Sequence, residues 1–164
     1  MTLLDRWDFP RGLSSQFPAP RYRVVYGKSG TLPAAAIISD DQAAIDQQLY
    51  WAGMETMEEA QYLSALLNSE TARQRVEHLQ ATGQWGARHF DKLLLSLPIP
   101  QFARRPLHNR LAKAAERAEA VAANVVIPDN MYFVTARGRI REALREDGVA
   151  AEIDGLVAEL LGPA

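Results

Sequence analysis

Two helix starts, at Thr56 and Ser69, constrain the fold more than any other feature of the sequence. Thr56 is followed three residues later by Glu59, and this capping box lets two side chains satisfy free amide groups at a helix N-terminus. Ser69 follows Asn68 and is a preferred residue for capping the next helix. The sequence therefore predicts two consecutive helices with a break between them at Asn68-Ser69.

Both predicted helices have an apolar face at helical spacing. We expect the second helix to stop at Gly83, because glycine readily adopts the left-handed backbone that ends many helices. The inward-facing residues are Met57, Ala60, Leu63 and Leu67 in the first helix and Ala72, Val76 and Leu79 in the second.

The segment before these helices favours strands. Residues 21–27 alternate and are rich in Val and Tyr, residues 34–39 form a short apolar run, and residues 44–50 alternate less regularly. We expect three strands over these ranges. The stretch from Gly27 to Gly30 is typical of a hairpin turn, because a phosphate-binding loop would need a helix with a Gly-Lys-Ser/Thr start directly after it.

Helices are also expected after residue 103. The first begins at Pro106, because proline suits the first helical turn, and the others cover 131–146 and 152–161. The glutamates beside Arg110, Lys113 and Arg117 favour a solvated face there. The expected outward row of the second helix is Arg137, Arg141 and Arg145, and Asp147-Gly148 ends it. The expected inward residues are Leu107, Leu111, Ala114, Ala118, Val121, Phe133, Ile140, Leu144, Ile153, Leu156, Val157, Leu160 and Leu161.

The loop at 83–89 concentrates binding chemistry in seven positions. Its glycines allow a close approach of the backbone to another molecule. Gln and Arg make bidentate bonds to purine edges, and Trp stacks on bases. For Trp85 alone, packing into the core is the favoured interpretation. For Arg88, His89 and Lys92, a solvated surface and a binding role both remain open.

An ordered series of short motifs over roughly residues 20–125 resembles a known family. It is similar to the C-terminal target-recognition (specificity) domain of restriction-modification N6-adenine DNA methyltransferases, with a looser similarity to specificity subunits of type I systems. The series is Tyr62-Leu63, Leu66-Leu67-Asn68-Ser69, Gly83-x-x-Gly86-x-Arg88, Lys92, Leu97-Pro98-Ile99-Pro100, His108 and Leu111-Ala112.

The resemblance implies sequence-specific binding of duplex DNA for a catalytic methyltransferase domain or subunit that lies outside this chain. A catalytic domain would join at residues 1–20, so the chain is expected to be an excised piece or a remnant. Phosphate contacts, assigned to Arg104 and Arg105, position such a domain without reading the sequence. The candidate DNA-binding residues are Lys28, Gln84, Trp85, Arg88, His89, Lys92, Arg104 and Arg105.

Charge is distributed unevenly along the chain. The net charge is −2, which argues mildly against nucleic acid as a partner. Residues 40–59 hold six acids and no Lys or Arg, whereas residues 88–145 hold eleven bases and five acids, a balance of 11 − 5 = +6. One face can therefore carry a positive field. The chain has no cysteine, which fits a cytoplasmic protein, and no apolar run long enough to suggest a membrane partner.

Catalytic motifs are missing from the sequence. There is no Asn/Asp-Pro-Pro-Tyr/Phe tetrapeptide for a flipped adenine and no Glu-x-Lys to accompany Pro128-Asp129 in a nuclease site. The three histidines lack metal-ligand spacing. We therefore expect a non-catalytic domain with no cofactor and no metal. The alternative function is a helical protein-interaction module that docks a partner subunit.

These observations predict an α+β fold, with a small N-terminal β-sheet packed with helices and a helical C-terminal part. The predicted order is an irregular arm over 1–20, a target-recognition core over 21–102 and a helical region over 103–164. A return strand is expected near 89–97.

Overall fold

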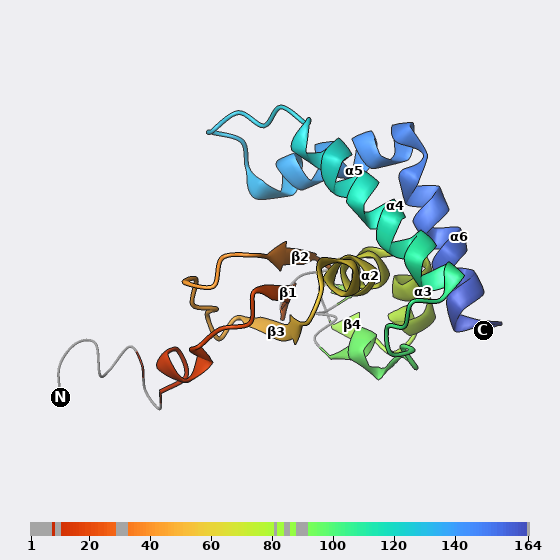
Figure 1. Ribbon diagram of the computed structural model, residues 1–164. Coiled ribbons are helices and arrows are strands. Elements are labelled where there is room, and N and C mark those ends of the chain that lie inside the picture. Colours follow the sequence, from red (N-terminus) through yellow and green to blue (C-terminus); the bar gives the residue numbers. More distant parts are fainter. Residues whose placement is uncertain are drawn as a thin grey trace.

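A computed structural model describes Asp8 and residues 11–28, 33–80, 82–83, 86–87 and 92–163. It confirms the α+β class: a three-stranded antiparallel sheet lies toward the N-terminus and helices follow it (Figure 1). A 3-10 helix, η1 (Ser14–Gln16), precedes the sheet, and a cis peptide bond joins Phe17 to Pro18.

The sheet has β1 (Tyr22–Gly27) at its centre, between β2 (Ala35–Ile38) and β3 (Leu49–Met54). The first two predicted strands are confirmed, but the third begins at Leu49 instead of residue 44. The side chain of Gln16 accepts from the Ile45 amide and donates to the Ile45 carbonyl, each at 2.8 Å. Leu49 is opposite Gly27, the last residue of β1, so residues 44–48 lie beyond the end of β1, and the Ile45 peptide groups bond to Gln16 instead.

The first predicted helix is confirmed as α2 (Met57–Asn68), with Thr56 as its cap. The Glu59 amide donates to the Thr56 hydroxyl at 3.2 Å. The Glu59 carboxylate accepts from the amide of Glu55, 2.9 Å away, which lies one residue before the cap. Tyr62 and Leu66 are fully buried between the sheet and the later helices. Local hydrogen bonds therefore start α2 where the sequence predicts it.

The second predicted helix is shorter than expected. α3 (Glu70–Glu77) begins at the Ser69 cap and buries Ala72 and Val76 as predicted. It ends before Gly83, and Leu79 is 54 % exposed, so the predictions for Leu79 and Gly83 are wrong. The amides of Leu79 and Gln80 bond to carbonyls three residues back, and this tighter turn rotates Leu79 away from the helix face.

The return strand predicted over 89–97 is also wrong in its described part. Residues Leu93–Ser96 form a 3-10 helix, η2, whose Leu94 is buried in the core. The Ser96 hydroxyl donates to the Leu93 carbonyl at 2.7 Å, which favours this turn over an extended strand. The strand pairing after α3 instead joins β4 (Thr82–Gly83) to β5 (Gly86–Ala87).

Two C-terminal helices continue the hydrophobic core. α4 (Pro106–Ala123) begins with proline as predicted and packs on α2, while α6 (Val149–Leu161) packs on α3 and α4. One hydrophobic cluster therefore includes residues from both the 21–102 and 103–164 segments. The buried members from α4 and α6 are Leu111, Ala112, Ala114, Ala115, Val149, Ile153, Leu156 and Val157.

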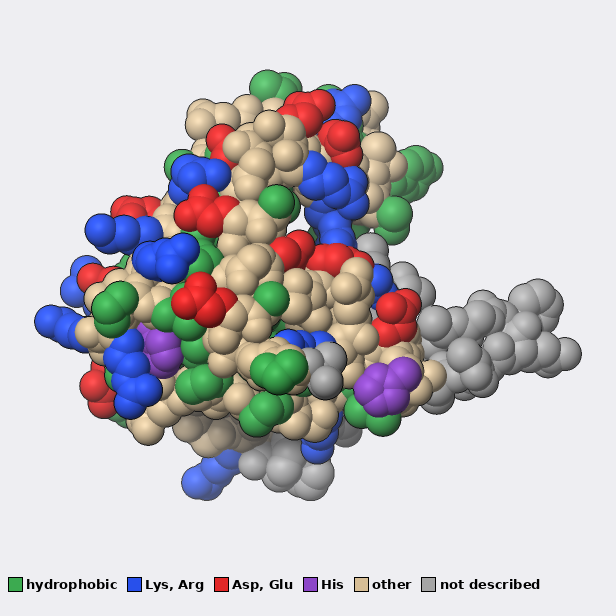
Figure 2. Space-filling view, turned by 90° about the vertical axis from the view of Figure 1, so that its right-hand side faces the viewer, with side chains coloured by type: hydrophobic (Ala, Val, Ile, Leu, Met, Phe, Trp, Pro, Cys, Tyr) green, Lys and Arg blue, Asp and Glu red, His purple; other side chains and the backbone are tan. Residues whose placement is uncertain are grey.

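In the helix between them, α5 (Phe133–Asp147), two residues of the row that we expected to be solvated contact the body. Arg137 donates to the Pro33 carbonyl, and Arg141 lies 3.5 Å from Glu70. Phe133, expected inside, is 74 % exposed. The predictions for these two arginines and for Phe133 are therefore wrong, because polar partners on the body orient α5. Figure 2 shows basic side chains reaching from the upper part of the molecule toward acidic ones below it.

Other predictions for α5 are confirmed. Arg145 is exposed and pairs with Glu142, and Leu144 packs against the core. Gly148 ends the helix with a φ of 87°, a left-handed conformation that glycine adopts without strain. α6 then starts at once, three residues before the expected position. No helix of the described residues is long and apolar enough to cross a membrane.

Candidate nucleic-acid interface

Two of the predicted site residues, Lys28 and Lys92, meet on one aromatic ring. Lys28 follows β1 and Lys92 precedes η2, so they are distant in the sequence. Their ammonium nitrogens lie 4.6 Å and 5.8 Å from the centroid of the Tyr50 ring. Contacts of this kind are attractive because the face of an aromatic ring is electron-rich. We name this group, consisting of Lys28, Lys92 and Tyr50, the lysine pair on Tyr50.

The strands fix the position of this group. Tyr50 belongs to β3 and pairs with Tyr26 of β1, and its partly buried ring packs against the core. The Lys28 amide donates to the Gln48 carbonyl at 3.2 Å, and its ammonium donates to the Gln47 carbonyl. Lys92 is exposed. Two positive charges, one from the end of β1 and one from the start of η2, therefore lie at the ring of Tyr50.

The glycine loop contains a short hairpin. Thr82 pairs with Ala87 and Gly83 with Gly86, in antiparallel register. The remaining candidates from this loop, Gln84, Trp85, Arg88 and His89, lie outside the described residues. Their assignment as DNA contacts stays a prediction.

Arg104 and Arg105 are exposed just before α4. The segment that carries them is tied to the core, because the Tyr62 hydroxyl donates to the Pro100 carbonyl at 2.8 Å and the Ala103 amide donates to His108 Nδ1 at 3.1 Å. Among the described residues, no hydrogen bond, ion pair or ring contact joins these arginines to the lysine pair on Tyr50. They form a second, separate basic position.

His108 supports this segment from inside the protein. Its ring stacks on Tyr62 with centroids 4.8 Å apart and an interplanar angle of 18°. Burial lowers the pKa of His108 below its ordinary value of 6.5, and the nearby positive charge of Arg105 lowers it further. The neutral ring accepts the Ala103 amide through Nδ1, and protonation would remove this acceptor.

Stability is expected to fall as the pH drops through the range in which His108 takes up a proton. The unfolded chain binds that proton near the ordinary pKa of 6.5 and the folded chain only below it. The stabilisation that depends on neutral His108 is therefore fully present above pH 6.5. It is lost as the pH falls toward the pKa of His108 in the folded protein. Urea unfolding at about pH 7.5 and about pH 5.5 measures this loss of stability, since histidine is the side chain that ordinarily titrates between these two pH values.

The comparison that isolates His108 uses a second histidine. His108→Gln should remove part of the difference between the two pH values, whereas His78→Gln, at an exposed position, should leave the difference unchanged. An equal pH dependence in all three proteins would contradict this assignment.

Arg23 is a polar side chain whose burial the sequence did not reveal. It is fully buried on β1, donates to the Asp40 carbonyl at 2.6 Å and lies 5.9 Å from the Trp51 ring. Its Nε and Nη1 have no hydrogen-bond partner among the described residues. Strand alternation indicates only that Arg23 lies on the face opposite Val24, which packs in the core.

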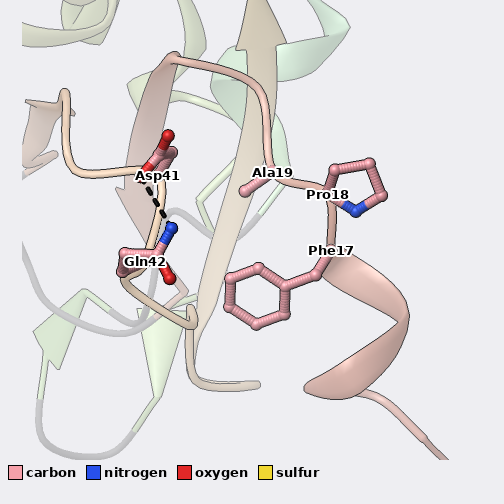
Figure 3. Close-up of a pocket in the computed structure, with 5 residues that line it drawn as sticks. All are labelled: Phe17, Pro18, Ala19, Asp41 and Gln42. Carbon is pink, nitrogen blue, oxygen red and sulfur yellow. Dashed lines mark hydrogen bonds between the residues drawn. The ribbon is translucent and has the colours of Figure 1, made fainter.

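A pocket of about 490 Å³ lies between the N-terminal arm and the loop after β2 (Figure 3). Its charged wall is a carboxylate, Asp41, which accepts a hydrogen bond from Gln42 at 2.9 Å. A wall of this sign does not suit a phosphate group, so the pocket is not part of the candidate interface. The residues that line it are Phe17, Pro18, Ala19, Asp41 and Gln42.

No group of three or more His, Asp or Glu side chains that could hold a metal is found within the described ranges. Comparisons with protein-family models, with curated proteins and with solved structures found no match to this chain.

Proposed function

We propose that this chain binds duplex DNA as the target-recognition part of a restriction-modification adenine methyltransferase, whose catalytic part is another domain or subunit. The observation that carries the proposal is the lysine pair on Tyr50. The sequence singled out Lys28 and Lys92 as DNA contacts from separate segments, and both lie on one ring.

Two ammonium groups at one aromatic ring suit the phosphate backbone of DNA. Lysine acts on phosphate as a point charge, and contacts of this type position a protein without reading the base sequence. The lysine pair on Tyr50 is therefore assigned to the backbone. Sequence reading falls to the glycine-loop candidates Gln84, Trp85, Arg88 and His89, as the family resemblance implies.

The exposed Arg104 and Arg105 add a second basic position, separate from the lysine pair on Tyr50. They belong to the 88–145 segment, whose formal balance of +6 contrasts with the net charge of −2 for the whole chain. Several of its arginines pair with acids outside the segment, such as Arg117 with Asp147 and Arg141 with Glu70, so the proposal uses only Arg104 and Arg105 from this excess.

A double variant tests the phosphate contacts. If Lys28 and Lys92 each neutralise one phosphate, replacing both by Ala should reduce the magnitude of the slope of log affinity against log salt by about 1.8, since each contact contributes about 0.9. Fluorescence anisotropy with a labelled mixed-sequence duplex, measured over a series of salt concentrations, gives this slope. The weakening should be similar for different duplex sequences.

Lys113→Ala is the matched control, because Lys113 is an exposed lysine on α4 outside the proposed contacts. It should leave the salt slope unchanged. If the double variant and the control lose the same amount of salt slope, the effect reports the overall charge of the protein and not contacts by Lys28 and Lys92. Failure of the unmodified protein to bind duplex DNA at low salt would overturn the proposed function.

One specific observation favours a second candidate, the protein-interaction module. The connection from α4 to α5 and the first turn of α5 expose a cluster of large apolar side chains, and Tyr132 is 84 % exposed. Exposed apolar side chains that gather on one surface commonly mark a site for a protein partner. Loss of duplex binding in the test above would make this candidate the leading one. The exposed cluster consists of Val126, Ile127, Tyr132, Phe133 and Val134.

A further inference from the structure

The sheet ends in an open strand. Its order is β2-β1-β3, so β2 has β1 on one side and, among the described residues, no strand on the other. Tyr26 lies opposite Ala35, and the Gly27 amide donates to the carbonyl of Ala34, directly opposite it, at 3.1 Å. In an antiparallel pair the bonding direction alternates along the strand. The peptide groups of Ala35 and Ile37 therefore point away from β1.

At Ala35 a side chain takes the place of a neighbouring strand. The Ala35 amide donates to Asn68 Oδ1 at 3.0 Å, and Asn68 Nδ2 donates back to the Ala35 carbonyl at 2.9 Å. Asn68 is itself held by the Ser64 carbonyl at 3.0 Å. A side-chain amide has one donor group and one acceptor, as a peptide group does, and here it makes the two bonds that a strand residue would make.

Ile37 is the next residue whose amide and carbonyl point away from β1, and these groups have no such partner. No hydrogen bond involves its amide or carbonyl within the described part of the chain. Sheet edges are commonly protected from other strands by lysine, proline or other charged residues. Residues Ala35–Ile38 contain none of these, and Ala36 is exposed.

We infer that the free edge of β2 binds an extended segment of another polypeptide, which adds to the sheet as a fourth strand beside Ile37. The edge presents an amide and a carbonyl at strand spacing, and an extended backbone is their complement. Asn68 marks where the added strand stops, because it already fills the position beside Ala35. This surface is independent of the proposed DNA interface.

The side chains of the added strand follow from the sheet. Ile37 points toward the core with Ala35, whereas Ala36 is exposed. A segment that alternates apolar and polar residues would match this arrangement, with its apolar residues on the side of α2. α5 lies above β2 in Figure 1, and Arg137 of α5 bonds the carbonyl of Pro33, just before β2.

The test uses a synthetic peptide of alternating valine and threonine, in excess over the full chain, with amide hydrogen exchange of Ile37 read by NMR. Backbone pairing should slow this exchange by about tenfold or more, since a free edge amide opens at little cost. The same peptide N-methylated at every residue lacks backbone donors on both edges and should give no protection. Equal protection by both peptides, or protection by neither, would overturn the inference.

Two substitutions at one position separate the backbone from the side chain. Ile37→Ala and Ile37→Pro both shorten the side chain, but only proline removes the outward amide, which the sheet itself does not use. Peptide binding, followed through the shifts of neighbouring amides, should survive in Ile37→Ala and be lost in Ile37→Pro. Equal binding by the two variants would overturn the inference. If Ile37→Pro does not fold, the N-methylated peptide decides the question with the unmodified protein.

Discussion

Leu111→Ala is expected to lower the free energy of unfolding by about 2–5 kcal/mol, the range for deleting a fully buried leucine side chain. Leu111 is fully buried on α4, within the cluster that joins α2 to the C-terminal helices. The substitution leaves a cavity there, because the helices around it are fixed by further packing and close over it only partly.

Urea unfolding followed by circular dichroism and by tryptophan fluorescence measures this loss and also tests cooperativity. All three tryptophans belong to residues 1–102, whereas helix is present on both sides of residue 103. With one shared core, the two signals should change together at a lower urea concentration. Val134→Ala, at an exposed position, should change stability by less than about 0.5 kcal/mol. An unchanged midpoint in Leu111→Ala would show that the C-terminal helices are held by something other than this core.

Asp154→Ala has the second-largest expected effect, a loss of about 1.5–3 kcal/mol, the range for hydrogen bonds to a charged group. Asp154 lies on α6 and its carboxylate accepts from the buried Ser69 hydroxyl at 2.7 Å and from the Thr71 amide at 3.2 Å. Both donors belong to the start of α3. A carboxylate at a helix N-terminus also interacts favourably with the helix dipole.

Thermal or urea unfolding of two further variants identifies the cause. Asp154→Asn keeps an acceptor oxygen while removing the charge, so it should lose less stability than Asp154→Ala. Asp129→Ala removes an exposed carboxylate outside any helix and should have little effect. If Asp154→Ala and Asp129→Ala behave alike, the contact between α6 and α3 contributes nothing measurable.

Residue types alone identified part of the candidate interface. A lysine in a glycine-containing turn and a lysine after a glycine loop were both recognisable as candidates in the sequence. Tyr50 was not, because it stood in a segment with imperfect alternation whose strand begins later than predicted. The convergence of both lysines on its ring requires β1, β3 and η2 to be assembled, and no local pattern encodes that.

The sequence by itself determined the features that depend on residues a few positions apart. Thr56 caps α2, Ser69 caps α3, Pro106 begins α4 and Gly148 ends α5 because each satisfies or restricts its own neighbouring backbone. These interactions form within one turn of chain, so their positions can be inferred before any packing is known.

The tertiary structure alone decided where long-range polar contacts override the local pattern. Arg141 turns inward because Glu70, 71 residues away, lies within ion-pair distance. The backbone of Ile45, in the segment before β3, bonds to Gln16, 29 residues away, and not to a strand. Helical periodicity separates an arginine row from an apolar row, but it does not say whether acids or water lie opposite the arginines. That choice depends on the free energy of long-range contacts, which exist only once the chain has folded.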